Sequence, residues 1–458
     1  MKNKFYTLAV ALILYSIGIS AQQTVTERLD SVRTNQYGQQ VSWLSLNPEA
    51  QEGIINFTSS DKSYRFWMDN RVQFDAAFFS NDVYNPIGNG YNIRRARVAF
   101  KAILWNNWYG EVDLDFAGSH IEMKDMIIGY IFDEHNIIAK VGQFKENFGM
   151  ETTTTSRYLT FMERSFVSKM DASRHLGLQV SHWKDKYLVV GGVHFNSQGD
   201  YEEVEFSQDH NKKLGLDEGY SLDARVVFRP IIDEDKMLHL GAAFTYRTPK
   251  TDVEVPNTFR FSTRSHTSIN RKKYIDTDDI KDTGNKTGMN FELAGAYKNF
   301  MFQGEYKKFN LQRTKNELEE VNIDGFYIQA GYLIFGGRYN YNKAEGEFTR
   351  ITRGKKYGEL EVAVRYDYVN ANDFDAKVYG GAAEGYSLGL NYHFNPNVKF
   401  MMNYVYNNHD RYANGKGKLY VGHDVGGNLT KVPSEVIEAK GKGGDDFGMV
   451  SFRMEIDF

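Results

Sequence analysis

Apolar and polar residues alternate along most of the chain. Between Glu359 and Tyr368 the even positions are apolar or aromatic, whereas four of the odd positions are charged. The same period of two recurs between Tyr386 and Phe394 and between Val450 and Phe458. A period of two is that of a β-strand whose two faces meet different surroundings. The pattern therefore predicts strands throughout the chain.

About sixteen segments of about ten residues carry this pattern. We predict strands over 65–79, 92–104, 108–117, 121–131, 136–144, 175–183, 186–196, 220–229, 237–247, 287–298, 300–311, 324–335, 357–369, 385–394, 398–408 and 447–458. Short turns and long connections alternate between them, with one departure, because residues 336–356 form a long connection on the side of the short turns. An even number of strands places both ends of the sheet on the same side.

Aromatic residues distinguish a membrane barrel from a soluble β-sandwich, which also alternates. The chain has 30 Tyr and 32 Phe, and tyrosines stand near strand ends, as at Tyr366, Tyr368, Tyr404 and Tyr406. Such residues gather where a barrel crosses the membrane interface. In lipid the sheet must close, because an open edge would leave backbone groups unpaired. We therefore expect an all-β fold, a closed antiparallel transmembrane β-barrel of about 16 strands.

The first residues have the features of a secretory signal peptide. Lys2 and Lys4 precede an apolar run from Phe5 to Ile19, and small residues follow at Ser20 and Ala21. We assign residues 1–21 to the signal peptide. Residues 22–63 do not alternate and are expected to form an N-terminal periplasmic extension, and residues 64–458 the barrel. The expected location is the outer membrane of a Gram-negative bacterium.

Composition excludes several classes of function. There are no cysteines, so thiolate metal sites and cysteine nucleophiles are excluded. A net charge of −4 argues against a nucleic-acid partner. Neither a His-Glu-x-x-His zinc motif nor a Gly-x-Ser-x-Gly elbow occurs, so we expect no enzyme activity and no cofactor or metal.

The second predicted strand carries a row of basic residues. Phe100 has the lipid-facing parity there, so Arg95, Arg97 and Lys101 are expected to face the lumen, while Arg94 has the other parity and is expected at the rim. Three cations on one inner wall form a track for anions, because arginine presents paired donors to phosphate or carboxylate.

The next strand supports a plainer interpretation of the same residues. Glu111, Asp113 and Asp115 have the lumen-facing parity beside that basic row. The cations would then only neutralise these acids, and the resulting field across the pore would filter polar solutes without a strong preference for anions. The residues alone leave both interpretations open.

The connection over residues 145–174 has too many apolar residues for a solvated loop, namely Phe148, Met150, Leu159, Phe161, Met162 and Phe166. We expect it to fold inward onto the lumen wall and to narrow the pore. Its cations Lys145, Arg157 and Arg164 are therefore candidates for the anion pathway.

Several segments resemble the phosphate-selective porin O and P family. They are Arg94-Arg95-Ala96-Arg97, Glu111-Val112-Asp113-Leu114-Asp115-Phe116-Ala117-Gly118, Gly142-Gln143-Phe144-Lys145-Glu146-Asn147-Phe148-Gly149, Leu159-Thr160-Phe161-Met162-Glu163-Arg164-Ser165, Glu361-Val362-Ala363-Val364-Arg365-Tyr366, Gly389-Leu390-Asn391-Tyr392 and Asn395-Pro396-Asn397-Val398. The resemblance implies a trimeric barrel of sixteen strands whose third extracellular loop folds inward. It also implies an arginine ladder with Arg95 and Arg97, and a constriction loop with Lys145 and Arg164. The long connection 336–356 looks like a feature of the same family.

Three hypotheses follow. The leading one is an outer-membrane porin, a homotrimer in outer-membrane lipid, that passively conducts small anions such as phosphate. The alternative is a general, weakly selective diffusion porin. The third is a barrel enzyme or adhesin that acts through its long extracellular loops.

Overall fold

The structure is a computed structural model. It describes residues 33–34, 37–41, 44–51, 53–80, 84–198, 209, 213, 219–249, 257–440 and 442–458. The predicted signal peptide lies outside these residues. The chain divides into two compact units, Met1–Leu46 and Asn47–Phe458. In the first unit β1 (Arg33–Thr34) pairs antiparallel with β2 (Gln40–Val41). No helix in the described ranges is long and apolar enough to cross a membrane.

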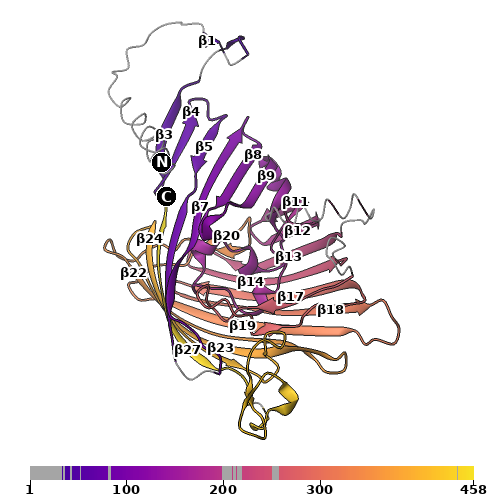
Figure 1. Cartoon of the computed structure of the whole chain (residues 1–458). Coiled ribbons are helices and arrows are strands. Elements are labelled where there is room, and N and C mark those ends of the chain that lie inside the picture. Colours follow the sequence, from indigo (N-terminus) through magenta and orange to yellow (C-terminus); the bar gives the residue numbers. More distant parts are fainter. Residues whose placement is uncertain are drawn as a thin grey trace, which may run out of the picture. The chain divides into compact units, whose positions relative to one another are not determined.

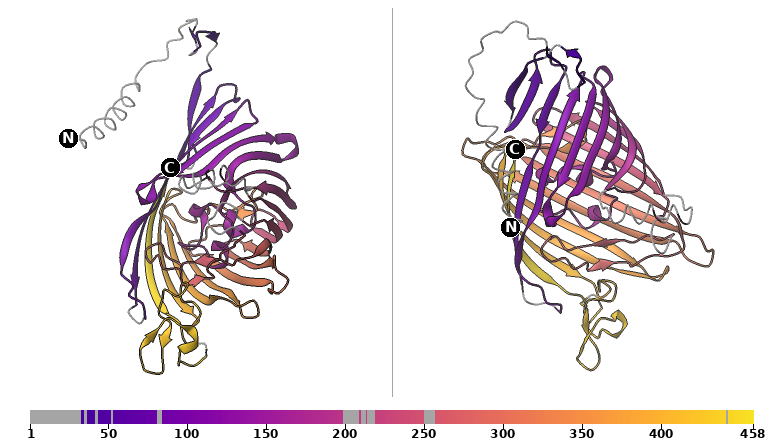
Figure 2. Two further views of the ribbon diagram at one scale, coloured as in Figure 1. Left: turned by 45° about the vertical axis from the view of Figure 1, so that its right-hand side comes forward. Right: turned by 45° about the horizontal axis from the view of Figure 1, so that its top comes forward.

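The second unit is a closed barrel in which each strand pairs antiparallel with its neighbours along the chain (Figures 1 and 2). Its sixteen principal strands are β6 (Arg71–Phe79), β7 (Gly90–Leu104), β8 (Trp108–Asp115), β9 (Glu122–Phe132), β10 (Ile137–Lys145), β11 (Arg174–Lys184), β12 (Tyr187–His194), β13 (Ser221–Ile232), β14 (Lys236–Arg247), β17 (Thr283–Tyr297), β18 (Phe300–Arg313), β19 (Val321–Leu333), β22 (Glu359–Asp373), β23 (Val378–His393), β24 (Val398–His409) and β27 (Phe447–Asp457). Pairing of β27 with β6 closes the sheet. The predicted fold class and strand number are confirmed.

The first predicted strand, 65–79, is divided in two. β5 (Arg65–Met68) and β6 both pair with β7, and β4 (Ile54–Ser59) adds to β5. At the break, the backbone of Asn70 exchanges two hydrogen bonds with Phe458, at 2.7 and 3.2 Å, so the pairing of β6 with β27 extends to Asn70. β4 lies within the range 22–63, where the alternation predicted no strand.

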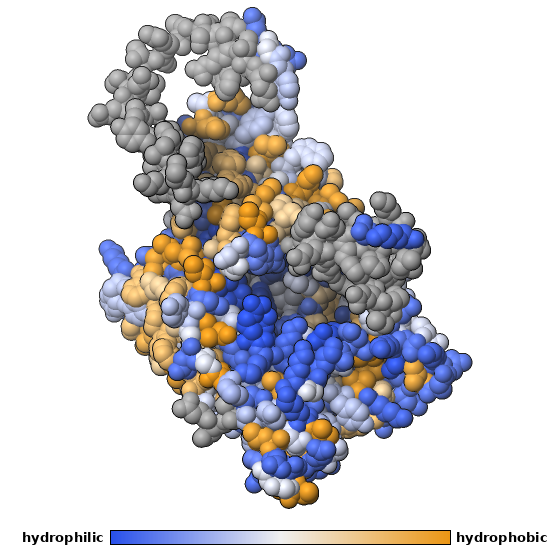
Figure 3. All heavy atoms as spheres, in the orientation of Figure 1, coloured by the Kyte–Doolittle hydropathy of each residue, from blue (hydrophilic) through white to orange (hydrophobic). Residues whose placement is uncertain are grey.

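The two faces of the barrel differ in the way that the alternation predicts. Leu388 and Tyr404 point outward and are both 46% exposed, whereas their inward-facing neighbours Ser387 and Asn403 are buried. In Figure 3, hydrophobic residues gather on the outer face of the barrel, and hydrophilic residues gather around the hollow. Aromatic pairs such as Trp108 and Tyr130, with ring centroids 5.0 Å apart, stand at the strand ends. An apolar outer band flanked by aromatic residues is the surface of a barrel in lipid.

The long connection that was predicted on the side of the short turns is present in the structure. Residues 334–358, here called the inner turn, connect β19 to β22 at the end of the barrel where the other connections are short. The inner turn carries the hairpin β20 (Tyr341–Asn342) and β21 (Glu347–Phe348), which lies within the barrel in Figure 1. Inward-facing Arg225 donates hydrogen bonds to the carbonyl oxygens of Glu345 and Gly346, at 3.0 and 2.9 Å.

We expect Leu388→Arg to destabilise the folded barrel by about 2–4 kcal/mol, because it places a charge on the lipid-facing wall. Leu388→Met, which keeps the side chain apolar, serves as the matched control. Equilibrium unfolding in lipid vesicles measures the difference. Equal stability of the two variants would mean that this face does not meet lipid.

Candidate functional site

The connection between β10 and β11 folds into the lumen as predicted. We call residues 146–173 the inner loop; it contains the short helix α2 (Met150–Thr153) and two 3-10 turns, η3 (Ser156–Tyr158) and η4 (Val167–Lys169). All six apolar residues that prompted the prediction are at least partly enclosed, and Met150 and Phe166 are completely buried. The inner loop therefore packs against the inside of the wall.

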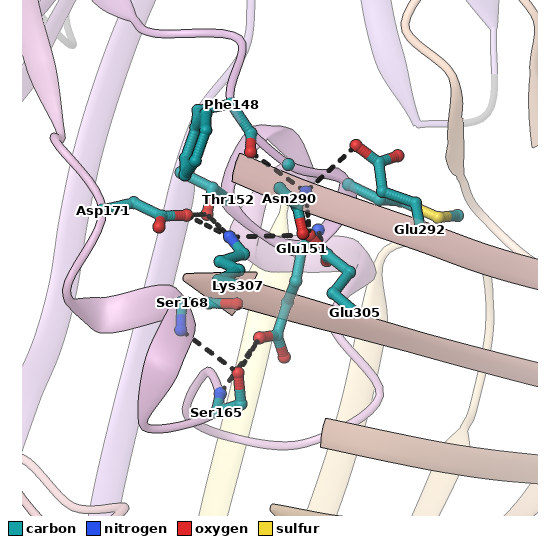
Figure 4. A network of polar contacts seen from close by, with 12 residues as sticks. Phe148, Glu151, Thr152, Ser165, Ser168, Asp171, Asn290, Glu292, Glu305 and Lys307 are labelled. Atoms are coloured by element: carbon teal, nitrogen blue, oxygen red, sulfur yellow. Dashed lines mark hydrogen bonds and ion pairs between the residues drawn. The ribbon is translucent and has the colours of Figure 1, made fainter. Parts of the chain in front are cut away.

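A buried ionic network attaches the inner loop to β17 and β18 (Figure 4). Lys307 of β18 pairs with Asp171 of the inner loop and lies 3.5 Å from Glu305, and none of these three side chains is exposed. Glu305 accepts a hydrogen bond of 2.7 Å from the backbone of Glu151, and Asn290 donates one of 3.0 Å to the carbonyl oxygen of Phe148. Because each charge has a partner, the loop is fixed in place on this side.

Further along, the inner loop is attached to the last strands of the barrel. Arg365 of β22 donates to the carbonyl oxygen of Glu163 at 3.0 Å, and Arg453 of β27 donates to that of Met162 at 2.8 Å. Asn391 of β23 reaches the carbonyl oxygen of Thr160 at 2.8 Å. Cations and amides of the wall thus satisfy the loop backbone where water is excluded.

Two cavities of several hundred cubic ångströms lie beside the inner loop. The outer cavity, of about 260 Å³, lies toward the long connections and is lined by Arg94, Glu163, Arg164, Lys169, Ser262, Thr263, Arg264, Thr267, Ser268 and Lys273. The inner cavity, of about 360 Å³, lies between the inner loop, the inner turn and the wall from β6 to β11. The outer cavity has five basic residues and one carboxylate, so its surface favours anions.

Three of the predicted cations are paired with carboxylates. Arg97 lies 3.0 Å from Asp115 and 3.7 Å from Asp113. Lys101 lies 3.0 Å from Asp69 and 3.2 Å from Glu111.

Arg157 of η3 also has two carboxylate partners, Asp69 and, at 3.2 Å, Asp457. Arg95 is buried and donates to the side-chain oxygen of Gln73 at 2.6 Å. Neutralisation by the neighbouring strand, the plainer of the two interpretations, therefore holds for Arg97 and Lys101.

Lys145 and Arg164 are held differently. Lys145 donates to the carbonyl oxygens of Thr153 and Thr154, at 3.0 and 3.1 Å. Arg164 donates to those of Glu151 and Thr154, at 2.8 and 2.5 Å. Neither cation has a carboxylate within 4 Å among the described residues. Arg164 lines the outer cavity and Lys145 the inner one, and both donate to the carbonyl oxygen of Thr154, so this oxygen lies between residues of the two cavities.

Arg94 is not at the rim. The pairing of β6 with β7 shifts between Gln73 and Phe74, so that Arg95 and Ile93 stand opposite successive residues and Arg94 is bulged. Such a bulge changes the direction of a side chain. Arg94 consequently points inward and pairs with Glu163 of the inner loop at 2.6 Å.

Six further cations that line the cavities were not among the predicted site residues: Arg71, Lys140, Lys169, Arg174, Arg264 and Lys273. Arg71 and Lys140 lie in strands β6 and β10. Lys169 and Arg174 lie in the 145–174 connection that was singled out, whereas Arg264 and Lys273 lie in a long polar connection. Their sequence signal is charge alone.

Two groups of the inner loop illustrate how burial and charge compete in the outer cavity. Burial lowers the pKa of the Lys169 ammonium to about 8, against the influence of Glu163. Burial raises the pKa of the Glu163 carboxyl, but Arg94 and Lys169 outweigh it, and the pKa ends well below its ordinary value. Glu163 therefore stays ionised and compensates part of the surrounding positive charge.

Glu111, Asp113 and Asp125 form the one cluster in the described ranges whose carboxylates are close enough to hold a metal ion. Each of the three already faces a cation, respectively Lys101, Arg97 and Arg174. The side chains of the protein thus supply the positive charge that a metal would bring.

The model of the family "Phosphate-selective porin O and P" matches residues 66–425. Porin O of Pseudomonas aeruginosa is 24% identical over 408 residues, which cover 80% of this chain and 88% of that protein. An uncharacterized protein of Caulobacter vibrioides is 23% identical over 360 residues, 77% of this chain and 70% of that protein. Among solved structures, OmpT of Vibrio cholerae in its trimer form is 12% identical, with a TM-score of 0.49 over 86% of this chain and 100% of that one.

We expect Lys307→Met to release this side of the inner loop, because it leaves Asp171 and Glu305 buried without their cation, at a cost of about 3–5 kcal/mol. Lys308→Met, on the exposed side of the same strand, is the matched control. Single-channel recordings should show a larger and noisier conductance for the first variant only. Unchanged conductance would show that the network does not hold the loop.

Proposed function

Because the chain belongs to the phosphate-selective porin O and P family, we propose that it selects small anions such as phosphate at the carbonyl oxygen of Thr154, where Lys145 and Arg164 meet. The protein is an anion porin of the Gram-negative outer membrane, a channel and not an enzyme. Its long connections are accordingly extracellular and its short turns periplasmic. No step of covalent chemistry is involved in passage.

The observation that carries this proposal is the difference in how the cations are compensated. Arg97 and Lys101 each have two carboxylate partners, so an anion beside them also meets negative charge. Lys145 and Arg164 donate only to carbonyl oxygens, so no carboxylate cancels their charge by contact among the described residues. A permeating anion gains most beside these two cations, and Arg164 can present paired donors to a phosphate.

The outer cavity supplies the approach to this site. Its five cations, Arg94, Arg164, Lys169, Arg264 and Lys273, face a single carboxylate, Glu163. A cleft lined mainly by one sign of charge concentrates counter-ions and directs them inward. Hydroxyl groups of Ser262, Thr263, Thr267 and Ser268 offer further donors that replace part of the hydration of the anion.

The inner cavity favours the alternative, a weakly selective pore. Its seven basic residues, Arg71, Arg97, Lys101, Lys140, Lys145, Arg157 and Arg174, are almost balanced by Asp69, Glu111, Asp113, Asp125, Glu345 and Glu347. Such a chamber conducts small ions of either sign. Selectivity would then come only from the outer cavity and the site at Thr154.

Reversal potentials of single channels across a salt gradient, followed by addition of phosphate, distinguish the two. We expect an anion-selective potential and a chloride current that low phosphate concentrations reduce. Arg164→Gln and Lys145→Gln should each raise the phosphate concentration for half-block about tenfold, the size of effect expected for one charge-assisted hydrogen bond.

Arg97→Gln is the matched control, because Asp115 and Asp113 already compensate that charge. It should shift the phosphate block less than either of the other two variants. A potential near zero without any phosphate effect would make the protein a general pore. Equal effects of all three variants would contradict the special role of Thr154.

We also propose that the protein assembles as a homotrimer through its outer wall between β5 and β10. An apolar groove there is lined by large and small residues side by side, including Phe66, Phe100, Ala102, Gly110 and Gly142. A side chain added at Gly110 would meet open space in the single chain. Gly110→Trp should therefore leave the barrel folded but convert trimers to monomers by light scattering in detergent. A wild-type monomer would contradict the proposal.

A further inference from the structure

The inner turn reaches the inner loop near Thr154 from the periplasmic side. Its strand β21 packs on α2 of the inner loop, and Glu347 of β21 is 6% exposed. The carboxylate side chain of Glu347 and the inner-loop residues Thr153 and Thr155 line the same cavity. Glu347 and Lys145 both line the inner cavity. The inner turn thus brings a carboxylate to the same stretch of the inner loop that carries the two uncompensated cations.

Glu347 and Lys145 face the same cavity without forming an ion pair. The carbonyl oxygen of Thr154 accepts hydrogen bonds from Lys145 and Arg164. The Glu347 carboxylate lines the inner cavity together with Lys145 but makes no ion pair of 4 Å or less with it among the described residues. The carboxylate therefore does not neutralise Lys145 by contact, but its charge acts on any anion that enters the shared cavity.

The position of Glu347 is fixed by contacts of the inner turn with the wall. Arg225, which is completely buried and paired with Glu292 at 2.8 Å, donates to the carbonyl oxygens of the two residues before Glu347. Arg350, three residues after Glu347, lies 2.7 Å from Asp457. Asp457 also pairs with Arg157 of the inner loop, so one carboxylate ties the inner turn and the inner loop together.

We propose that Glu347 is a specificity-determining residue that weakens anion binding at Lys145 and Arg164 and thereby sets the rate of release to the periplasm; this inference rests on the proposed function. A pore conducts only if its site holds the ion weakly enough for it to leave. The fixed negative charge on the periplasmic side of the site opposes tight binding. On the extracellular side, the outer cavity is lined mainly by cations. No comparable negative charge there opposes the binding of an anion.

The test compares phosphate block of the chloride current in wild type, Glu347→Gln and Glu345→Gln, recorded in planar bilayers with the full-length protein. Recordings are made at pH 8, because burial and the neighbouring Glu345 raise the pKa of Glu347 to about 7. Glu347→Gln should lower the phosphate concentration for half-block about three- to tenfold, the effect of one unit charge in a shared wet cavity.

Glu345→Gln removes the same charge from the same cavity, but from a residue that precedes β21, and should shift the block less. Glu347→Asp keeps the charge and should retain block near that of wild type. When Lys145 is also changed to Gln, Glu347→Gln should lose most of its effect. Recordings count only for variants that migrate as folded barrels in unheated gels.

Two results would overturn the inference. The first is a Glu347→Gln variant that phosphate blocks like wild type, although wild type is anion-selective. The second is an equal shift in Glu345→Gln, which would mean that only the total charge of the inner cavity matters. A wild-type channel without anion selectivity or phosphate block would instead refute the proposed function itself, and the inference with it.

Discussion

The buried ion pair between Lys307 and Asp171, with Glu305 beside it, is the interaction on which the rest of the site depends. These charges are completely enclosed, so the loss of one partner would leave the others uncompensated in a medium of low dielectric constant. Their mutual pairing holds the inner loop against β17 and β18, and Arg365 and Arg453 continue the attachment on the last strands. The space that remains lies between the inner loop and β6 to β11. The position of the pore is thus set by where the loop is attached rather than by the barrel.

Compensation of charge, rather than its amount, distinguishes the parts of this pore. Along β7 the cations Arg97 and Lys101 are matched by acids of adjoining segments, which stabilises the wall and leaves little net field. At Thr154 the cations rest on backbone oxygens, which cannot cancel a full charge. Two basic residues can therefore stabilise the wall through ion pairs in one place and form an anion site in another.

Alternation of residues was sufficient to predict the barrel, because lipid outside and water inside impose a period of two on every strand. The number of apolar residues in the 145–174 connection predicted the inward loop, since residues such as Phe161 and Phe166 are buried and not in solvent. The alternation failed where the period is interrupted. The bulge that turns Arg94 inward has no sequence signal. The partners that separate Arg97 from Lys145 come from residues far apart in the chain, and neither those pairings nor the inward path of residues 334–358 follows from local pattern.

The central claim is that anions bind beside those cations of the protein whose charge no carboxylate already compensates. Anomalous diffraction from crystals soaked in bromide tests it most directly, because it locates the ions without assuming a permeation model. The account predicts bromide in the outer cavity and beside Lys145 and Arg164 at the carbonyl oxygen of Thr154, and none between Arg97 and Asp115. Bromide distributed evenly along β7, or absent from Thr154, would contradict it.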